Sequence, residues 1–111
     1  MPRPIRTIEI YLLLDYNDGR TIEESKYVRL EDELLTRFGG VTSLQRQFPL
    51  RGLWRSEDRV FQDRVVVFSV LDFEARTEPQ VLRYLERLKS GLKKKFAQME
   101  ILITMQEMLA I

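Results

Sequence analysis

The residues of this chain best suited to bind a small molecule lie in an arginine-rich segment around its only tryptophan. Arg51, Trp54 and Arg55 are close together in the sequence. A guanidinium group binds carboxylates and phosphates in a forked geometry, and an indole ring provides an apolar wall. We therefore predict a ligand site formed by Arg51, Trp54 and Arg55 together with Tyr11. The alternative, in which the tryptophan closes the end of the core and the arginines are solvated, stays open.

Other chemistry is poorly supported, because the chain has no histidine and no cysteine. Thiolate metal sites and disulfides are excluded, and a base near neutral pH would have to be a carboxylate, a lysine or a tyrosine. Asp15 and Asp63 are candidates, but both are expected at strand ends in water. The loop that begins at Asp15 is no calcium loop, since Arg20 and Lys26 stand where glycine and glutamate are needed. We predict no catalytic residues, no metal and no cofactor.

The bulk composition describes one globular domain over residues 1–111, with 44% apolar and 32% charged residues. The formal net charge is +1, from 18 basic and 17 acidic residues. A nucleic-acid-binding domain is usually clearly basic, so nucleic acid is not an expected partner. No apolar run is long enough for a signal peptide or a membrane span. The expected location is the cytoplasm.

Two helices are indicated by apolar residues at spacings of three and four. The first covers about residues 22–38, with a capping box at Thr21 and Glu24 and a glycine stop at Gly39. The second follows another capping box, formed by Thr77 and Gln80.

Four strands are indicated by period-two alternation or by continuous apolar runs. They cover about residues 6–15, 41–55, 59–71 and 99–108. Pro49 interrupts the second strand, which is therefore expected to lie at a sheet edge or to carry a bulge, because proline cannot donate to a ladder. The order strand, helix, strand, strand, helix, strand predicts an α+β ferredoxin-like βαββαβ fold, with a four-stranded antiparallel sheet and both helices on one face.

The second face of this sheet also carries apolar residues, which a solvated face would not need. A contiguous apolar patch usually marks an interface. We predict a homodimer in which two copies pack sheet against sheet, through Leu13, Val65, Val67, Leu71 and Leu102. Coverage of this face by the chain's own hairpin or a terminus is the alternative.

Three resemblances bear on function. Residues 37–72, with a Gly-x-Trp-Arg segment, a polar hairpin tip and a valine-rich strand, resemble small uncharacterised bacterial ferredoxin-like domains. The two-faced sheet is similar to that of dimeric α+β barrel proteins, some of which bind small apolar ligands or oxidise them without a cofactor. Ile10-Tyr11-Leu12 resembles the shorter RNA-contact motif of an RRM domain, but the longer motif on the third strand lacks its glycines and its second aromatic.

The function predicted from the sequence is a non-enzymatic, homodimeric binding or assembly module. The first alternative is a small-molecule binder or cofactor-free enzyme of the dimeric α+β barrel type, with a pocket near Trp54, Tyr11 and the hairpin arginines. The second alternative is an RNA-binding plait domain, whose affinity would fall steeply with salt.

Overall fold

The computed structural model describes residues 1–43, 50–74 and 77–111. Two helices and five strands occur in these ranges. In chain order they are β1 (Arg3–Leu13), α1 (Glu24–Phe38), β2 (Thr42–Ser43), β3 (Leu50–Ser56), β4 (Arg59–Asp72), α2 (Glu78–Lys95) and β5 (Leu102–Ala110).

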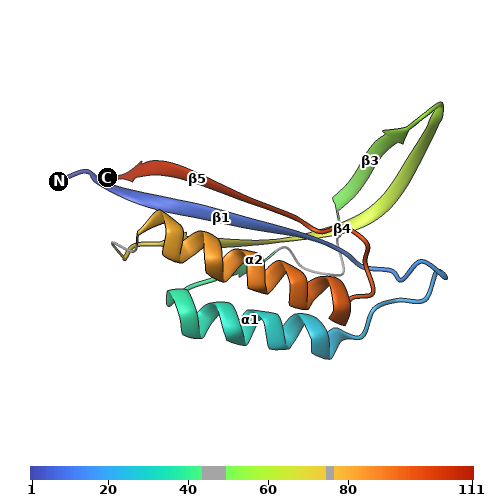
Figure 1. Ribbon diagram of the computed structural model, residues 1–111, viewed down its shortest axis with the longest axis horizontal. Helices are drawn as coiled ribbons and strands as arrows, with labels where there is room; N and C mark the ends of the chain where they lie inside the picture. The colour runs from blue at the N-terminus through green and yellow to red at the C-terminus, as the bar shows by residue number, and fades with distance from the viewer. Residues whose placement is uncertain (44–49, 75–76) are drawn as a thin grey trace.

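The strands form one antiparallel sheet in the order β2-β4-β1-β5, and β3 pairs with the other half of β4. Both helices cover the same face of the sheet, and the other face is open (Figure 1). The predicted ferredoxin-like α+β fold is confirmed. The central strands are β4 and β1, and a central strand covered on both faces suits the apolar content of these two segments.

The core lies between the helices and the covered face of the sheet. Tyr27 from α1 is at its centre, stacked 6.3 Å from the Phe68 ring of β4 and in edge contact with Phe96 at 5.1 Å. The Tyr27 hydroxyl donates a hydrogen bond to the backbone oxygen of Leu13 at 2.5 Å. The remaining fully covered side chains on this face include Ile8, Ile10, Leu12, Leu34, Val66, Val70 and Val81.

The helix ends follow the predictions in two cases and depart from them in one. The capping box of Thr77 and Gln80 forms, with bonds of 3.4 and 3.1 Å, and Gly39 ends α1 at a φ of 83°. The box predicted at Thr21 is wrong, because Thr21 forms a β-bridge with Asp15 and α1 starts only after Glu23. The backbone of Thr21 is thus held in an extended pair.

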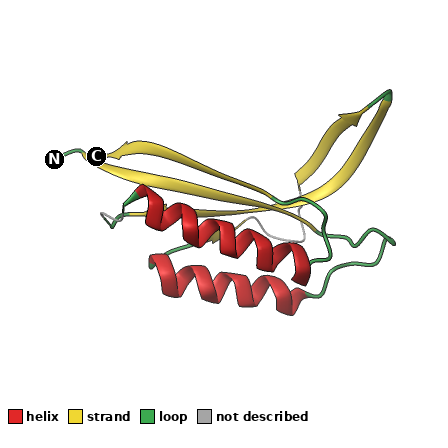
Figure 2. Cartoon of the chain, in the orientation of Figure 1, coloured by secondary structure: helices red, strands yellow, loops and turns green. Residues whose placement is uncertain are grey.

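The strand predicted over residues 41–55 is split into β2 and β3, both paired with β4 at the edge of the sheet. This agrees with the predicted edge position, although Pro49 itself lies outside the described residues. β3 and the first part of β4 form a hairpin that rises away from the helices (Figures 1 and 2). At Gly52 an added Cβ would lie 2.8 Å from a methyl carbon of Val65, so the close approach of the two hairpin strands requires glycine.

Candidate functional site

The open face of the sheet carries a polar band across its centre. In the sheet register Glu9 of β1 lies between Ser69 of β4 and Thr104 of β5. The neighbouring row adds Thr7 and Gln106. The sequence prediction of an apolar second face missed this band, because it counted only the apolar residues on each strand. The open face therefore has two apolar margins with a carboxylate between them.

The residues predicted for a dimer interface occupy both margins. Four of them gather around Tyr11, whose register partners are Val67 and Leu102, and next to it Leu13 pairs with Val65. Leu71 lies on the far side of the polar band, opposite Thr7. Leu102 and Leu71 are 59% and 43% exposed, whereas Val67 is only 9% exposed. In a single copy, Leu102 and Leu71 therefore offer more accessible surface than Val67.

The residues predicted for a ligand site do not converge within one copy. Arg51 and Arg55 lie on β3, where they pair with Arg64 and Val60. Strand alternation places them on the opposite side of the ribbon from Val65, which shares the open face with Tyr11. Both arginines are exposed. The side chain of Trp54 lies outside the described residues, so its predicted role stays a prediction.

Asp15, one of the two carboxylates considered as a base, is already committed to an ion pair. Arg64 donates hydrogen bonds to both of its oxygens, one of them at 2.9 Å. This hydrogen bonding lowers the pKa of Asp15. A carboxylate with a lowered pKa is a poor proton acceptor near neutral pH, so Asp15 acts as a structural tie between β4 and the loop after β1.

A second ionic cluster fixes the start of α1 against the end of α2. The Tyr16 hydroxyl donates to Glu23, and the ammonium of Lys26 contacts Tyr16, Glu23 and the backbone oxygen of Lys95, the last at 2.6 Å. The hydrogen bond from Tyr16 is the main reason that the pKa of Glu23 falls to about 2. The charged forms of Glu23 and Lys26 are both favoured in this cluster, which joins the two helices.

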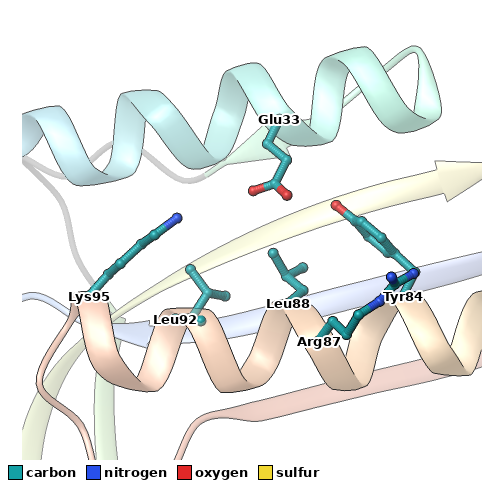
Figure 3. A pocket seen from close by; sticks show the side chains of 7 residues that line it. Glu33, Tyr84, Arg87, Leu88, Leu92 and Lys95 are labelled. Carbon is teal, nitrogen blue, oxygen red and sulfur yellow. The ribbon is translucent and has the colours of Figure 1, made fainter.

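A groove of about 350 Å³ runs between α1 and α2 on the outer side of the helices (Figure 3). Glu33 comes from α1, and Tyr84, Arg87 and Lys95 come from α2. Leu88 and Leu92 lie between them in the view of Figure 3. This groove could not be predicted from the sequence, since its charged residues follow an ordinary helical pattern. Its one signal was the glycine at position 91, inside a helix.

Among residues 1–43, 50–74 and 77–111, no group of three or more acidic side chains is arranged to hold a metal ion. In the same ranges no helix is both long and apolar enough to cross a membrane.

No model of a known protein family matches the sequence, and no curated protein matches it. Two solved structures have the same fold. Phage SAM lyase in complex with S-methyl-5'-thioadenosine matches with a TM-score of 0.71 and 16% identity, over 93% of this chain and 81% of that one. Phage SAM lyase in the apo state matches with a TM-score of 0.69 and 16% identity, over 96% and 84% of the two chains.

This likeness corrects the function predicted from the sequence. The main prediction, a non-enzymatic binding or assembly module, is wrong, since the solved structures that share the fold along almost the whole chain are those of an enzyme. The first alternative, a small-molecule-binding or cofactor-free enzyme, agrees better with this finding.

Proposed function

We propose that this protein is an enzyme that cleaves S-adenosylmethionine (SAM), or a closely related sulfonium nucleoside, and releases S-methyl-5'-thioadenosine. The observation that supports the proposal is the fold match over 93% of the chain to a SAM lyase that holds this thioether. Because fold alone does not determine chemistry, the proposal also needs groups on this chain that suit the substrate.

The proposed reaction requires no covalent bond between the protein and the substrate. The bond between the sulfonium sulfur and the four-carbon amino acid chain breaks, and its electron pair moves to sulfur, which becomes a neutral thioether. The carbon chain is completed either by loss of a proton from the neighbouring carbon or by attack of its own carboxylate. A site for this reaction must bind the sulfonium cation. It must also place a base near the carbon that loses a proton, or hold the substrate's own carboxylate near the carbon that it attacks.

Glu9 is the group on this chain that best meets the need for a negative charge near the sulfonium. It lies in the middle of the open face, between Ser69 and Thr104, with Tyr11 next along the same side of β1. Hydroxyl groups beside a carboxylate can bind the ribose and amino acid parts of the substrate. We place the substrate on this face, with Glu9 as the electrostatic partner of the sulfonium.

An open sheet cannot enclose a ligand alone, because small-molecule sites bury most of the ligand surface. We propose that a second copy of the chain covers this face. The predicted interface residues Leu13, Val65, Val67, Leu71 and Leu102 would form its apolar margins.

The enzymatic proposal is tested by incubating the purified protein with SAM and measuring S-methyl-5'-thioadenosine by chromatography and mass spectrometry. We expect the thioether to form faster than in a protein-free control. Glu9→Gln should lower kcat/KM by roughly 100-fold, and the control Glu86→Gln on the exposed side of α2 should not. If no thioether forms above the spontaneous rate, the proposal fails. If it forms equally fast with Glu9→Gln, only the assignment of the site fails.

The proposed self-association is tested by measuring the molar mass of the wild-type chain and of Leu102→Lys by light scattering. Leu102 is 59% exposed in one copy, so the lysine should not strain the monomer, but it would bring a charge into the contact. Leu35→Lys, at a leucine that is 52% exposed on α1, is the matched control. We expect only Leu102→Lys to lower the molar mass. A wild-type chain that keeps a monomeric mass both without and with added SAM would overturn this contact.

A further inference from the structure

The groove between α1 and α2 has two features that packing within the chain does not explain. The first is Gly91, inside the C-terminal third of α2. A glycine inside a helix costs about 1 kcal/mol relative to alanine. An added Cβ would meet no atom within 4 Å, and the residue is not among those with positive φ. Neither the backbone nor a neighbouring side chain therefore requires glycine here, but its small size keeps this part of the groove open.

The second feature is the hydroxyl of Tyr84. It is covered by surrounding atoms and has no hydrogen-bond partner of normal length within the described part of the chain. The ring is held by Phe38 in edge contact at 5.7 Å and by the Arg37 guanidinium at 4.5 Å. Burial, followed by the charge of Glu33, raises the pKa of Tyr84 to about 12. A covered polar group without a partner costs free energy, which a ligand group that bonds to this hydroxyl would recover.

The charges around the groove differ in sign between its two walls. Glu33 extends from α1, while Arg87 and Lys95 extend from α2 (Figure 3). Neither Arg87 nor the Lys95 ammonium forms an ion pair with any residue in the described ranges. Leu88 and Leu92 supply an apolar strip between the walls. A phosphate would be repelled by Glu33, and an uncharged hydrocarbon would leave all three charged groups without a role.

We propose that this groove binds a zwitterionic α-amino acid with an apolar side chain. Its ammonium would lie at Glu33, its carboxylate at Lys95, and its side chain over Leu88 and Leu92 beside Gly91. A volume of about 350 Å³ is sufficient for a molecule of this size. The groove opens on the helix side of the molecule, so this site is separate from the one proposed on the open sheet face and does not depend on it.

The test is a titration of the full chain with three probes, followed by the backbone NMR resonances of α1 and α2. The probes are L-leucine, L-leucinamide, which lacks the carboxylate, and N-acetyl-L-leucine, which lacks the ammonium. We expect L-leucine at millimolar concentrations to shift resonances around Gly91 and Glu33. Each capped probe should bind about tenfold more weakly, as expected for the loss of one charge-assisted contact worth about 1.4 kcal/mol.

Two variants locate the site. Gly91→Leu should fill the groove and abolish the shifts, and Glu33→Gln should weaken L-leucine without changing the affinity for N-acetyl-L-leucine. Ser90→Leu, at an exposed neighbouring position, is the control and should bind like the wild type. The proposal is overturned if L-leucine causes no shifts, if all three probes bind equally, or if Gly91→Leu binds normally. Because the readout is binding, it stands whether or not the chain cleaves SAM. A loss of SAM cleavage in Gly91→Leu would also overturn the separation of the two sites.

Discussion

Two tyrosines provide a sharp test of how hydrogen bonding contributes to this fold. Tyr27→Phe and Tyr84→Phe each remove one phenolic oxygen, but the two hydroxyls differ in their surroundings. The hydroxyl of Tyr27 bonds to the Leu13 backbone oxygen at 2.5 Å, whereas that of Tyr84 has no partner of normal length within the described ranges. We expect the first variant to be destabilised and the second to be unchanged or stabilised.

The size of each effect follows from what the removed oxygen contacts. In Tyr27→Phe the ring contacts with Phe68 and Phe96 remain, whereas the hydrogen bond to Leu13 is lost and its carbonyl is less satisfied, which costs about 1–2 kcal/mol. For a domain of this size that corresponds to a fall of about 4–8 °C in Tm. In Tyr84→Phe a buried hydroxyl without a hydrogen-bond partner of normal length disappears, so the change should lie between about zero and 1 kcal/mol in the stabilising direction.

Urea unfolding, followed by circular dichroism and by the fluorescence of the single tryptophan, measures both variants against the wild type. Equal slopes with denaturant would show that the unfolded states are comparable. The reasoning is refuted if Tyr84→Phe is destabilised as much as Tyr27→Phe, or if Tyr27→Phe has wild-type stability.

Three further predictions concern local features. Gly52→Ala should cost about 1–3 kcal/mol through overpacking, measured by urea unfolding, and adding Val65→Ala should make the pair cost less than the sum of the two single changes. Thr77→Ala should cost about 1 kcal/mol by the same assay, whereas Thr21→Ala, at a position that does not cap a helix, should cost clearly less. The stability contributed by Glu23 is fully present above pH 4.5 and is lost as the pH falls toward its folded pKa of about 2. Thermal unfolding of Glu23→Gln should therefore show a smaller loss of Tm across this range than the wild type, and an equal loss would contradict the assigned pairing.

The fold was predictable because its determinants are repeated along the chain. Alternation in β1, the apolar run in β4 and the helical stripes each specify an element, and several residues agree at every step. The box at Thr21 failed because its signature also fits a threonine in a β-bridge, and the partner that decides between them, Asp15, lies six residues earlier. The residues next to Thr21 cannot show whether it caps a helix or pairs in a β-bridge, because the contact with Asp15 decides between the two.

The candidate site was less predictable, although one part of it was visible. The alternation that placed Tyr11 and Leu13 on the open face also places Glu9 there, so its carboxylate could have been assigned from β1 alone. Its neighbours Ser69 and Thr104 need the register of three strands. The proposed enzyme class has no local signature in the sequence, and the solved structures that share the fold are only 16% identical to this chain. Many sequences meet the demands of packing, whereas chemistry depends on a few positions.

The polar band changes what a contact on the open face can be. A fully dry contact between two sheets would bury Glu9 without a cation, which costs several kcal/mol and would favour the monomer. A second copy can cover the apolar margins around Leu71 and Leu102 only if the space above Glu9 stays solvated or receives a positive charge. The proposed sulfonium substrate would provide such a charge above Glu9. Self-association and a cationic substrate therefore support each other, and we expect SAM to raise the molar mass of the wild-type chain in dilute solution but not that of Glu9→Gln.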